Sequence, residues 1–372
     1  MAASAKGLRQ LSYTDCPGGG QIVVKNNIAY VGSMAGPDGT VLFDVTDPCN
    51  PREVFRMGMF IGTHSHKVRV ANDIMLVNRE KHPYQPGAPA DFKGGLGIYD
   101  VSTRGKPKLI SEWKTGGSGV HRFDFDGRYA YISPTVEGYL GNIVMILDLI
   151  DPANPVEVSR WWMPGQWTAG GEVATWPAKD NRCHHPLRFG NRLYVSYWFG
   201  GFVILDIEDI TKPKMVSSFC TSPPYPWPTH TALPIQFPLK GKNVMLVADE
   251  DVRKRFESTS SFLWLYDITN EKHPMPFSSF QVEDVTGEPV EPYSGCHQPS
   301  EIITSTEIPV AWFAHGLRIV DIANPHRPVE VAHFKPEPSI GDRIQSNDVT
   351  VDDRGLIYLL DRIKGFHILE RV

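Results

Sequence analysis

Short apolar runs recur along the whole chain, and six of them end in the same way. Each run closes on an Asp, and a Pro follows seven positions after that Asp. Successive Asp residues are 48 to 61 positions apart, which is the period expected of a propeller or solenoid repeat. The six pairs are Asp44/Pro51, Asp100/Pro107, Asp148/Pro155, Asp206/Pro213, Asp267/Pro274 and Asp321/Pro328.

A second pattern lies between these signatures and predicts two further strands. HKVRVANDIMLVN starts at His66, HRFDFDGRYAYIS at His121 and HPLRFGNRLYVSYW at His185. Their Asn-Asp, Asp-Gly and Gly-Asn pairs favour hairpin turns with positive φ, between strands of alternating polarity. With the strand that ends in Asp and the strand after Pro, each unit has four antiparallel strands, as in a propeller blade. The Asp is expected to cap the turn, and the Pro to separate the two outer strands.

The repeat count predicts an all-β fold, a seven-bladed β-propeller, with six or eight blades as the alternatives. The segment 366–372 reads as the third strand of a blade with no fourth strand after it, and 7–15 reads as a fourth strand with no third before it. Pairing the N- and C-terminal strands in one blade would leave no free sheet edge. We therefore expect residues 1–372 to form a single domain with long, aromatic-rich lid loops on one face.

Composition excludes several classes of function. A net charge of −5 over 372 residues favours neither nucleic acid nor an anionic membrane as a partner. Five Cys without a CxxC argue against a disulfide framework or zinc ribbon, and with no apolar leader or span the cytoplasm is the expected location. Phosphate-binding and Ser-hydrolase motifs are absent, and GGSGVH (116–121) only resembles the latter.

Histidines recur at the start of the first strand of successive blades. That strand is the innermost of a blade, so its first residue is expected to face the central channel. Equivalent positions hold Gly20 in the first blade and Asn347 in the last, and Ser300 is an alternative equivalent in the sixth. Neutral imidazoles sharing a metal repel one another less than a cationic cluster would. The predicted ligands are His66, His121, His185, His230 and His297.

An all-imidazole site favours a transition metal over magnesium or calcium, with iron or copper first and manganese or zinc as alternatives. Glu172, Glu250 and Glu301 are candidates to orient the imidazoles or act in proton transfer. His64, on the same strand face as His66, is an alternative ligand, and His184 is expected to point the opposite way from His185, into the core or behind the ligands. The candidate catalytic residues are Glu172, Glu301, His64 and His184. A metal-free histidine cluster with acid–base chemistry, and simple structural packing, remain open. Cys183 and Cys296 adjoin ligand candidates, but buried thiols are the better interpretation.

Aromatic residues in two loops next to these histidines predict an apolar pocket for an organic substrate, with aromatic molecules among the candidates. Packing of the loops onto the propeller explains the same residues equally well. Asn347 is included because it holds the histidine position in its own blade. The candidate substrate-binding residues are Trp162, Trp167, Trp176, Tyr225, Trp227 and Asn347.

The segments LRIVDIANPHRPVEV and VMILDLIDPANPVEV resemble the LVIVD-repeat family of β-propellers over nearly the whole chain. LYVSYWFGGFVILDIEDITKPKMV (193–216) is more distantly similar to the selenium-binding protein/methanethiol oxidase family. That second resemblance implies a propeller with axial histidines associated with copper. The carotenoid-cleavage dioxygenases, which hold iron with four axial histidines in a seven-bladed propeller, share the architecture but no motif.

These patterns favour a metal-dependent oxidase or dioxygenase acting on a small organic molecule. Metal-assisted hydrolysis or lyase chemistry, with the metal as Lewis acid, is the alternative among enzymes. A non-catalytic interaction scaffold is the alternative outside enzymes. We expect no nucleic-acid or membrane partner, and the exposed Trp161–Trp162 pair is compatible with a homo-oligomer.

Overall fold

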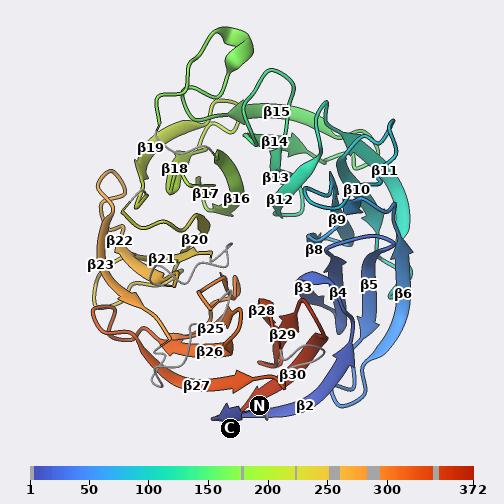
Figure 1. Ribbon diagram of the computed structural model, residues 1–372, viewed down its shortest axis with the longest axis vertical. Coiled ribbons are helices and arrows are strands. Elements are labelled where there is room, and N and C mark those ends of the chain that lie inside the picture. The colour runs from blue at the N-terminus through green and yellow to red at the C-terminus, as the bar shows by residue number, and fades with distance from the viewer. Residues whose placement is uncertain (1–3, 177–179, 223, 251–259, 283–293, 338–342) are drawn as a thin grey trace. The chain divides into compact units, whose positions relative to one another are not determined.

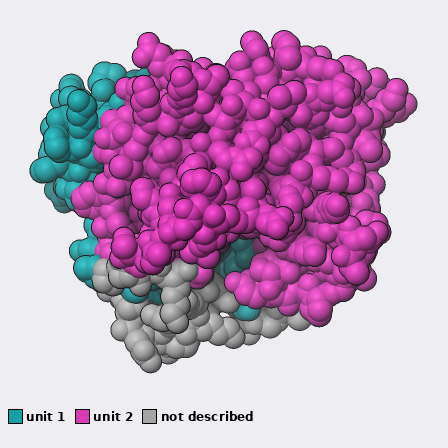
Figure 2. All heavy atoms as spheres, turned by 90° about the horizontal axis from the view of Figure 1, so that it is seen from above, with its two compact units in different colours: residues 1–24, 47–51, 224–372 teal, residues 25–46, 52–223 magenta. Residues whose placement is uncertain are grey.

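The computed structural model describes residues 4–176, 180–222, 224–250, 260–282, 294–337 and 343–372. Parts of the predicted loops 161–183, 219–229, 248–261 and 282–296 therefore lie outside the described residues. The chain separates into two compact units, coloured in Figure 2. Unit 1 comprises 1–24, 47–51 and 224–372, and unit 2 comprises 25–46 and 52–223. The single domain expected for residues 1–372 stays a prediction.

Unit 2 is built of antiparallel sheets, and within a sheet most strands pair with the strand that precedes or follows them along the chain (Figure 1). Its first strands are β4 (Ile28–Ser33), β5 (Asp38–Asp44) and β6 (Arg52–Gly58). Next come β7 (Thr63–His64), β8 (Val68–Ala71), β9 (Ile74–Lys81), β10 (Gly95–Asp100) and β11 (Lys108–Lys114). A third group consists of β12 (Val120–Phe125), β13 (Tyr129–Pro134), β14 (Val144–Asp148) and β15 (Val156–Trp161). The fourth group consists of β16 (Asn181–Phe189), β17 (Arg192–Trp198), β18 (Phe202–Asp206) and β19 (Lys214–Phe219).

Unit 1 has the same construction. It contains β20 (Thr229–Pro234), β21 (Val244–Asp249), β22 (Leu263–Asp267) and β23 (Met275–Phe280). A second group is β24 (Gln298–Pro299), β25 (Glu307–Trp312), β26 (Gly316–Asp321) and β27 (Val329–Lys335), with β1 (Ser4–Lys6) added beside β27. The last group is β28 (Ser346–Val351), β29 (Ile357–Asp361), β30 (Gly365–Arg371) and β2 (Leu8–Asp15). β3 (Gly19–Lys25) ends at the boundary between the units.

The repeated Asp residues cap their turns as predicted. In all six repeats the Asp Oδ1 accepts a hydrogen bond from the backbone N–H two residues later, at 2.8–3.0 Å. Each Asp is the last residue of its strand, and each Pro immediately precedes the first residue of the following strand. The Asp–Pro signature therefore marks the turn between the two outer strands of every repeat in which it occurs.

Positive-φ residues form the hairpins, as the sequence predicted. Asn72 and Asp73 have φ values of 47° and 61°, and Gly127 and Gly190 have φ values of 101° and 56°. Two consecutive positive φ angles are the geometry of a two-residue turn whose twist matches that of the flanking strands. The tight hairpin between β8 and β9 fixes the register that carries Asn78 and Glu80.

Apolar side chains on facing sheets form the core within each unit. In unit 2 one cluster includes Leu96, Ile98, Phe123 and Ile132, so β10 packs against β12 and β13. In unit 1 a cluster joins Leu317, Leu359 and Leu369 to Leu8 of β2. The last strands of three sheets, β6, β11 and β19, are mostly exposed, with partly buried positions between the exposed ones, as expected at an edge.

The two terminal segments pair within unit 1. β2 and β30 are antiparallel from Leu8↔Arg371 to Asp15↔Gly365 and complete the four-stranded order β2-β30-β29-β28. Across the described ranges the helical content is one 3-10 turn, Thr168–Gly170, so the chain is all-β as predicted. No helix there has the length and hydropathy that a membrane crossing requires.

Candidate metal centre

Three neighbouring chain segments of unit 2 bring a carboxylate and three histidines together. His64 ends β7, His66 follows it two residues later, Glu80 lies near the end of β9, and His121 is the second residue of β12. β7 pairs with β9 so that His64 faces Glu80, and Glu80 forms an isolated bridge with Gly119 just before β12. One potential ligand atom from each of the four residues lies within 4.8 Å of the others.

Glu80 connects two of these histidines through a single oxygen. Its Oε2 lies 2.6 Å from His64 Nε2 and 2.8 Å from His121 Nδ1. A carboxylate only accepts, so both ring nitrogens carry a hydrogen in this arrangement. The side chains of His64, Glu80 and His121 are 2%, 10% and 18% exposed, so this contact is largely shielded from water.

Charge and burial set the protonation of this cluster. Burial lowers the pKa of His121 to about 4, although Glu80 opposes the shift. Burial also lowers the pKa of His66 well below its usual value, and the neighbouring His64 and Lys67 add to the effect. For Glu80, burial alone would raise the pKa, but attraction to His121 and hydrogen bonds from His121 and His64 outweigh it and lower the pKa. The pKa shifts therefore favour an ionised Glu80 beside neutral His121 and His66 at neutral pH.

Asn78 determines which nitrogen of His66 carries hydrogen. The Lys67 backbone N–H donates to Asn78 Oδ1 at 2.8 Å, which fixes the amide so that Nδ2 points the other way. Asn78 Nδ2 donates to the Val120 carbonyl at 3.0 Å and to His66 Nδ1 at 3.1 Å. A neutral His66 must then carry its hydrogen on Nε2. His66 thus presents an N–H group, whereas a metal ligand needs a free lone pair at the binding nitrogen.

His185, a predicted ligand, lies in unit 2 between two arginines. Arg122 Nη1 approaches His185 Nδ1 at 3.0 Å, and Arg69 Nη2 approaches Nε2 at 3.3 Å. Burial, then the charges of Arg122 and Arg69, lower the pKa of His185 well below its usual value. His184 packs its ring 4.9 Å from that of His121 and 4.5 Å from Trp198. The structure therefore brings His64, His66 and His121 together, whereas His185 lies against the guanidinium groups of Arg122 and Arg69.

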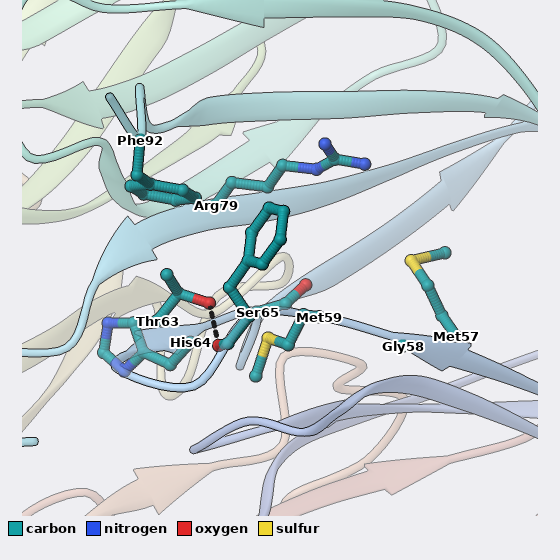
Figure 3. Close-up of a pocket in the computed structure, with 9 residues that line it drawn as sticks. Met57, Gly58, Met59, Thr63, His64, Ser65, Arg79 and Phe92 are labelled. Carbon is teal, nitrogen blue, oxygen red and sulfur yellow. Dashed lines mark hydrogen bonds between the residues drawn. The ribbon is translucent and has the colours of Figure 1, made fainter. Parts of the chain in front are cut away.

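A pocket of about 90 Å³ borders the cluster on the His64 side (Figure 3). Its lining is mainly apolar, with Met57, Met59, Phe60 and Phe92 around His64. Thr63 donates to the Phe60 carbonyl at 2.6 Å and fixes the loop that carries Phe60 (Figure 3). Arg79 also lines the pocket, but its guanidinium is engaged by Glu112 and by Tyr99.

The predicted ligands His230 and His297 lie in unit 1 and form a separate group. Their ring centroids are 4.0 Å apart, and His297 Nε2 lies 3.5 Å from Glu250 Oε1. Asn347 accepts a hydrogen bond from His297 Nδ1 on its carbonyl. The Asn347 amide is engaged by the Gly20 carbonyl and by Arg362.

The predicted carboxylates and thiols occupy different surroundings. Glu172 accepts hydrogen bonds from Trp162 Nε1 and from the backbone of Gly165 and Trp167, so it organises its own loop. Glu301 accepts from Gln298 Nε2 at 3.2 Å in unit 1. Cys183 and Cys296 are fully buried, as expected, and burial raises the pKa of both thiols well above the usual value.

The candidate substrate-binding aromatics pack mainly with one another. The rings of Trp162 and Trp167 meet at 5.7 Å, and Trp162 also contacts Tyr139 at 5.2 Å. Trp176 lies against the position of Gly165, where an added Cβ would come within 2.4 Å of its ring. In unit 1 Tyr225 packs edge-on against Trp264, and Trp227 is buried. These contacts account for loop packing, while Phe60 and Phe92 line the pocket beside His64.

The sequence interpretation missed Glu80 and Asn78. It considered only the first strand of each repeat, and these two residues lie on the second strand. Alternation along IMLVNREK places Asn78 and Glu80 on the same face, two positions apart. The available signal was a buried amide and a buried carboxylate at the end of one strand, beside the segment that carries His64 and His66.

Comparison with known proteins supports the repeat and the fold. The LVIVD repeat family matches residues 189–221, which cover β17–β19, and residues 310–335, which run from within β25 to the end of β27. No curated protein matches, so the similarity to the selenium-binding protein family rests on residues 193–216 alone and stays a prediction. The structure is similar to the crystal structure of Saccharomyces cerevisiae Sqt1, a WD-like propeller, with a TM-score of 0.56 at 10% identity.

That similarity covers 96% of this chain and 87% of the Sqt1 chain. At 10% identity it shows the fold alone. The chain therefore has a β-propeller fold with LVIVD repeats, and it contains histidine and glutamate groups that can hold a metal ion.

Proposed function

We propose that the chain is a metal-dependent oxidative enzyme whose ion is bound by His64, His121 and Glu80 in unit 2. The observation that carries this proposal is the shared Glu80 oxygen, 2.6 Å and 2.8 Å from the two histidine nitrogens. Two histidines and one carboxylate on one side of an ion leave other positions open, as in non-haem iron(II) oxygenases. Dioxygen is the oxidant in this proposal, and the ion supplies its activation.

The distances suit such an ion with little rearrangement. Adjacent ligands of an octahedral ion with bonds of about 2.1 Å lie about 3.0 Å apart, so the two contacts of Glu80 Oε2, at 2.6 Å and 2.8 Å, need to lengthen by only a few tenths of an ångström. The hydrogens on His64 Nε2 and His121 Nδ1, which now bond to Glu80, would have to leave before these nitrogens could bind an ion. Binding therefore requires each imidazole to carry its hydrogen on the opposite nitrogen, and the burial that keeps His121 neutral favours this state.

His66 is proposed as a hydrogen-bond donor beside the ion. Asn78 keeps the hydrogen of neutral His66 on Nε2, so the ring can donate a hydrogen bond to a substrate or product oxygen and stabilise charge that develops there. The pocket lined by Met57, Met59, Phe60 and Phe92 receives the apolar part of the substrate. At about 90 Å³ it is smaller than the cavity of about 150 Å³ that holds benzene, so it favours a short apolar group.

Anaerobic loading with Fe²⁺, followed by elemental analysis and measurement of oxygen consumption, tests the proposal. The wild-type chain is expected to hold iron in unit 2 and to consume oxygen with a small organic substrate from a panel. His121→Ala is expected to lose that iron. His66→Gln is expected to keep the iron and lower turnover, since it removes the imidazole hydrogen-bond donor and leaves the ligands.

Controls separate the competing functions. His82→Gln is the matched control, because the His82 ring packs edge-on against His64, with centroids 5.1 Å apart, and lies outside the ligand set. Retention of iron by His121→Ala would contradict the ligand assignment. Zinc bound at the same residues without oxygen consumption would favour hydrolase or lyase chemistry, because His₂Glu is also a catalytic zinc set. Failure to bind any metal would favour the non-catalytic scaffold, which the repeat architecture alone supports equally well.

We also infer seven blades closed by the terminal strands. The β3–β6, β7–β11, β12–β15, β16–β19, β20–β23, β24–β27 and β28–β30/β2 groups support this number. The β2–β30 pairing supports closure, because it leaves neither terminal strand as a free edge. A crystal structure with six or eight blades, or with a gap beside β2, would overturn this inference.

A further inference from the structure

We propose that Ser65 selects the substrate in the pocket beside His64, and that this substrate is a short, neutral molecule with a hydrogen-bonding oxygen. The inference rests on the function proposed above, because it concerns the same site in unit 2. One buried hydroxyl group carries it. Ser65 lines the pocket and is 3% exposed, and its Oγ atom has no hydrogen-bond partner among the residues that the structure describes.

The local hydrogen bonds hold the chain at Ser65 but do not use its hydroxyl. The Ser65 backbone N–H donates to the Ser33 carbonyl at 3.1 Å, and the Ser65 carbonyl accepts from the Ser33 N–H at 3.0 Å. Figure 3 shows the Ser65 oxygen directed toward the side of the pocket that carries Met57 and Met59, with the His64 ring on the other side of the segment. A buried hydroxyl without a partner costs free energy, so a ligand that bonds to it gains more than apolar contact alone would give.

Charge in the pocket favours a neutral ligand. Arg79 is the lining residue with a permanent charge, and its guanidinium forms an ion pair with Glu112 and donates to the Tyr99 hydroxyl at 2.8 Å. A carboxylate or ammonium group would therefore enter the pocket without a partner of opposite charge. Burial of an unpaired charge is far more costly than burial of a neutral group that makes one hydrogen bond.

The volume of the pocket limits the size of the ligand. A cavity of about 150 Å³ holds benzene, so by proportion a pocket of about 90 Å³ holds about four non-hydrogen atoms. A buried water makes about three hydrogen bonds, and the mainly apolar lining offers it few partners. A small alcohol or ketone needs one partner for its oxygen, which the Ser65 hydroxyl can supply as a donor, and its carbon atoms contact Met57, Met59 and the two Phe rings.

Titration of the metal-free full chain with probes of matched size, followed by NMR of the methionine methyl groups, tests the proposal. Met57 and Met59 line the pocket, so their signals are expected to shift. The neutral probes 1-propanol and acetone are expected to bind with roughly millimolar affinity, and acetate and propylammonium about tenfold more weakly or less. Ser65→Ala is expected to weaken 1-propanol binding about three- to tenfold. Ser111→Ala is the matched control, because the Ser111 hydroxyl donates to the Pro152 carbonyl outside the pocket, and it is expected to leave the affinity unchanged.

Xenon shows whether the Ser65→Ala variant keeps the pocket. It binds to apolar surface and needs no hydrogen bond, so it is expected to shift the same methionine signals in the wild-type chain and in the variant. Equal affinity of both chains for 1-propanol, acetate binding as tight as that of 1-propanol, or no methionine shift with 1-propanol in the wild-type chain would overturn the proposal.

This proposal and the proposed function fail separately. Binding of 1-propanol that depends on Ser65, in a chain that holds no iron, would contradict the proposed function and leave the role of Ser65 intact. Iron retention and oxygen consumption, with 1-propanol bound as well by Ser65→Ala as by the wild-type chain, would contradict the role of Ser65 alone.

Discussion

Individual hydrogen-bond partners decide the role of each histidine in this chain. His64 and His121 share a carboxylate, His66 accepts from an amide, and His185 lies against two guanidinium groups. Their equivalent sequence positions gave no indication of these differences, because the partners come from other strands. The rings of His66 and His121, which the histidine spacing singled out, lie 4.8 Å apart, but the proposed chemistry depends on Glu80 and Asn78.

Replacing Glu80 distinguishes a ligand from a residue that only orients one. Glu80→Gln keeps the size of the side chain and removes its charge. Loss of an orienting partner lowers metal affinity roughly 10–100-fold, so loss of a ligand is expected to lower iron affinity by more than about 100-fold. Competition with a chelator of known affinity measures the change. A reduction of less than tenfold would place Glu80 outside the ligand set.

His367 predicts a pH dependence of stability that is independent of the metal. It is buried in β30, and burial, with a contribution from Lys364, lowers its pKa from 6.5 to about 4. The unfolded chain therefore binds a proton between pH 6.5 and 4 that the folded chain does not, and stability falls as pH falls. The contribution reaches about 3 kcal/mol at pH 4. Denaturant unfolding of wild type and His367→Leu at pH 7 and 4 should show a smaller loss in the variant. Equal losses would contradict the prediction.

At the scale of elements, local sequence predicted the repeats well. The Asp–Pro signature and the positive-φ turns specify strand ends through bonds within a few residues, so they could be recognised without the fold. The aromatic loops could not be interpreted in this way. Trp162 and Trp167 pack against each other and Glu172 bonds to their own loop, contacts that depend on the conformation of the whole segment.

The turn after β26 tests the structural role of the repeated Asp. Asp321 Oδ1 accepts from the Ala323 backbone N–H at 2.9 Å. Asp321→Ala removes this acceptor and is expected to cost about 1 kcal/mol of unfolding free energy. Asp321→Asn keeps an oxygen in the same place and is expected to cost less than half as much. Denaturant midpoints measure both changes, and equal destabilisation by the two variants would argue against the turn-capping role.

At the scale of the whole molecule, the pairing of the two terminal strands is the contact expected to contribute most to stability. β2 contributes a full edge strand to β30, and Leu8 enters a core cluster of unit 1. Removing residues 1–15 is expected to leave β30 as an unpaired edge and to promote aggregation. The free energy of unfolding is expected to fall by roughly 5 kcal/mol, which lowers the thermal midpoint by more than about 10 °C.

Removing residues 1–6 is the matched control for that deletion. It takes away β1, whose three residues are exposed, and leaves β2 in place. The shorter deletion is expected to change the thermal midpoint little. Thermal unfolding with simultaneous light scattering compares the two, and similar midpoints would show that the terminal pairing contributes little to the fold.

The most direct test of the proposed metal centre is a crystal structure of the iron-loaded chain with data at the iron absorption edge. The account predicts an anomalous peak about 2.0–2.2 Å from His64 Nε2, His121 Nδ1 and Glu80 Oε2, with His66 near but unbound. Iron bound elsewhere, or these three atoms still hydrogen-bonded to one another in a loaded crystal, would contradict it.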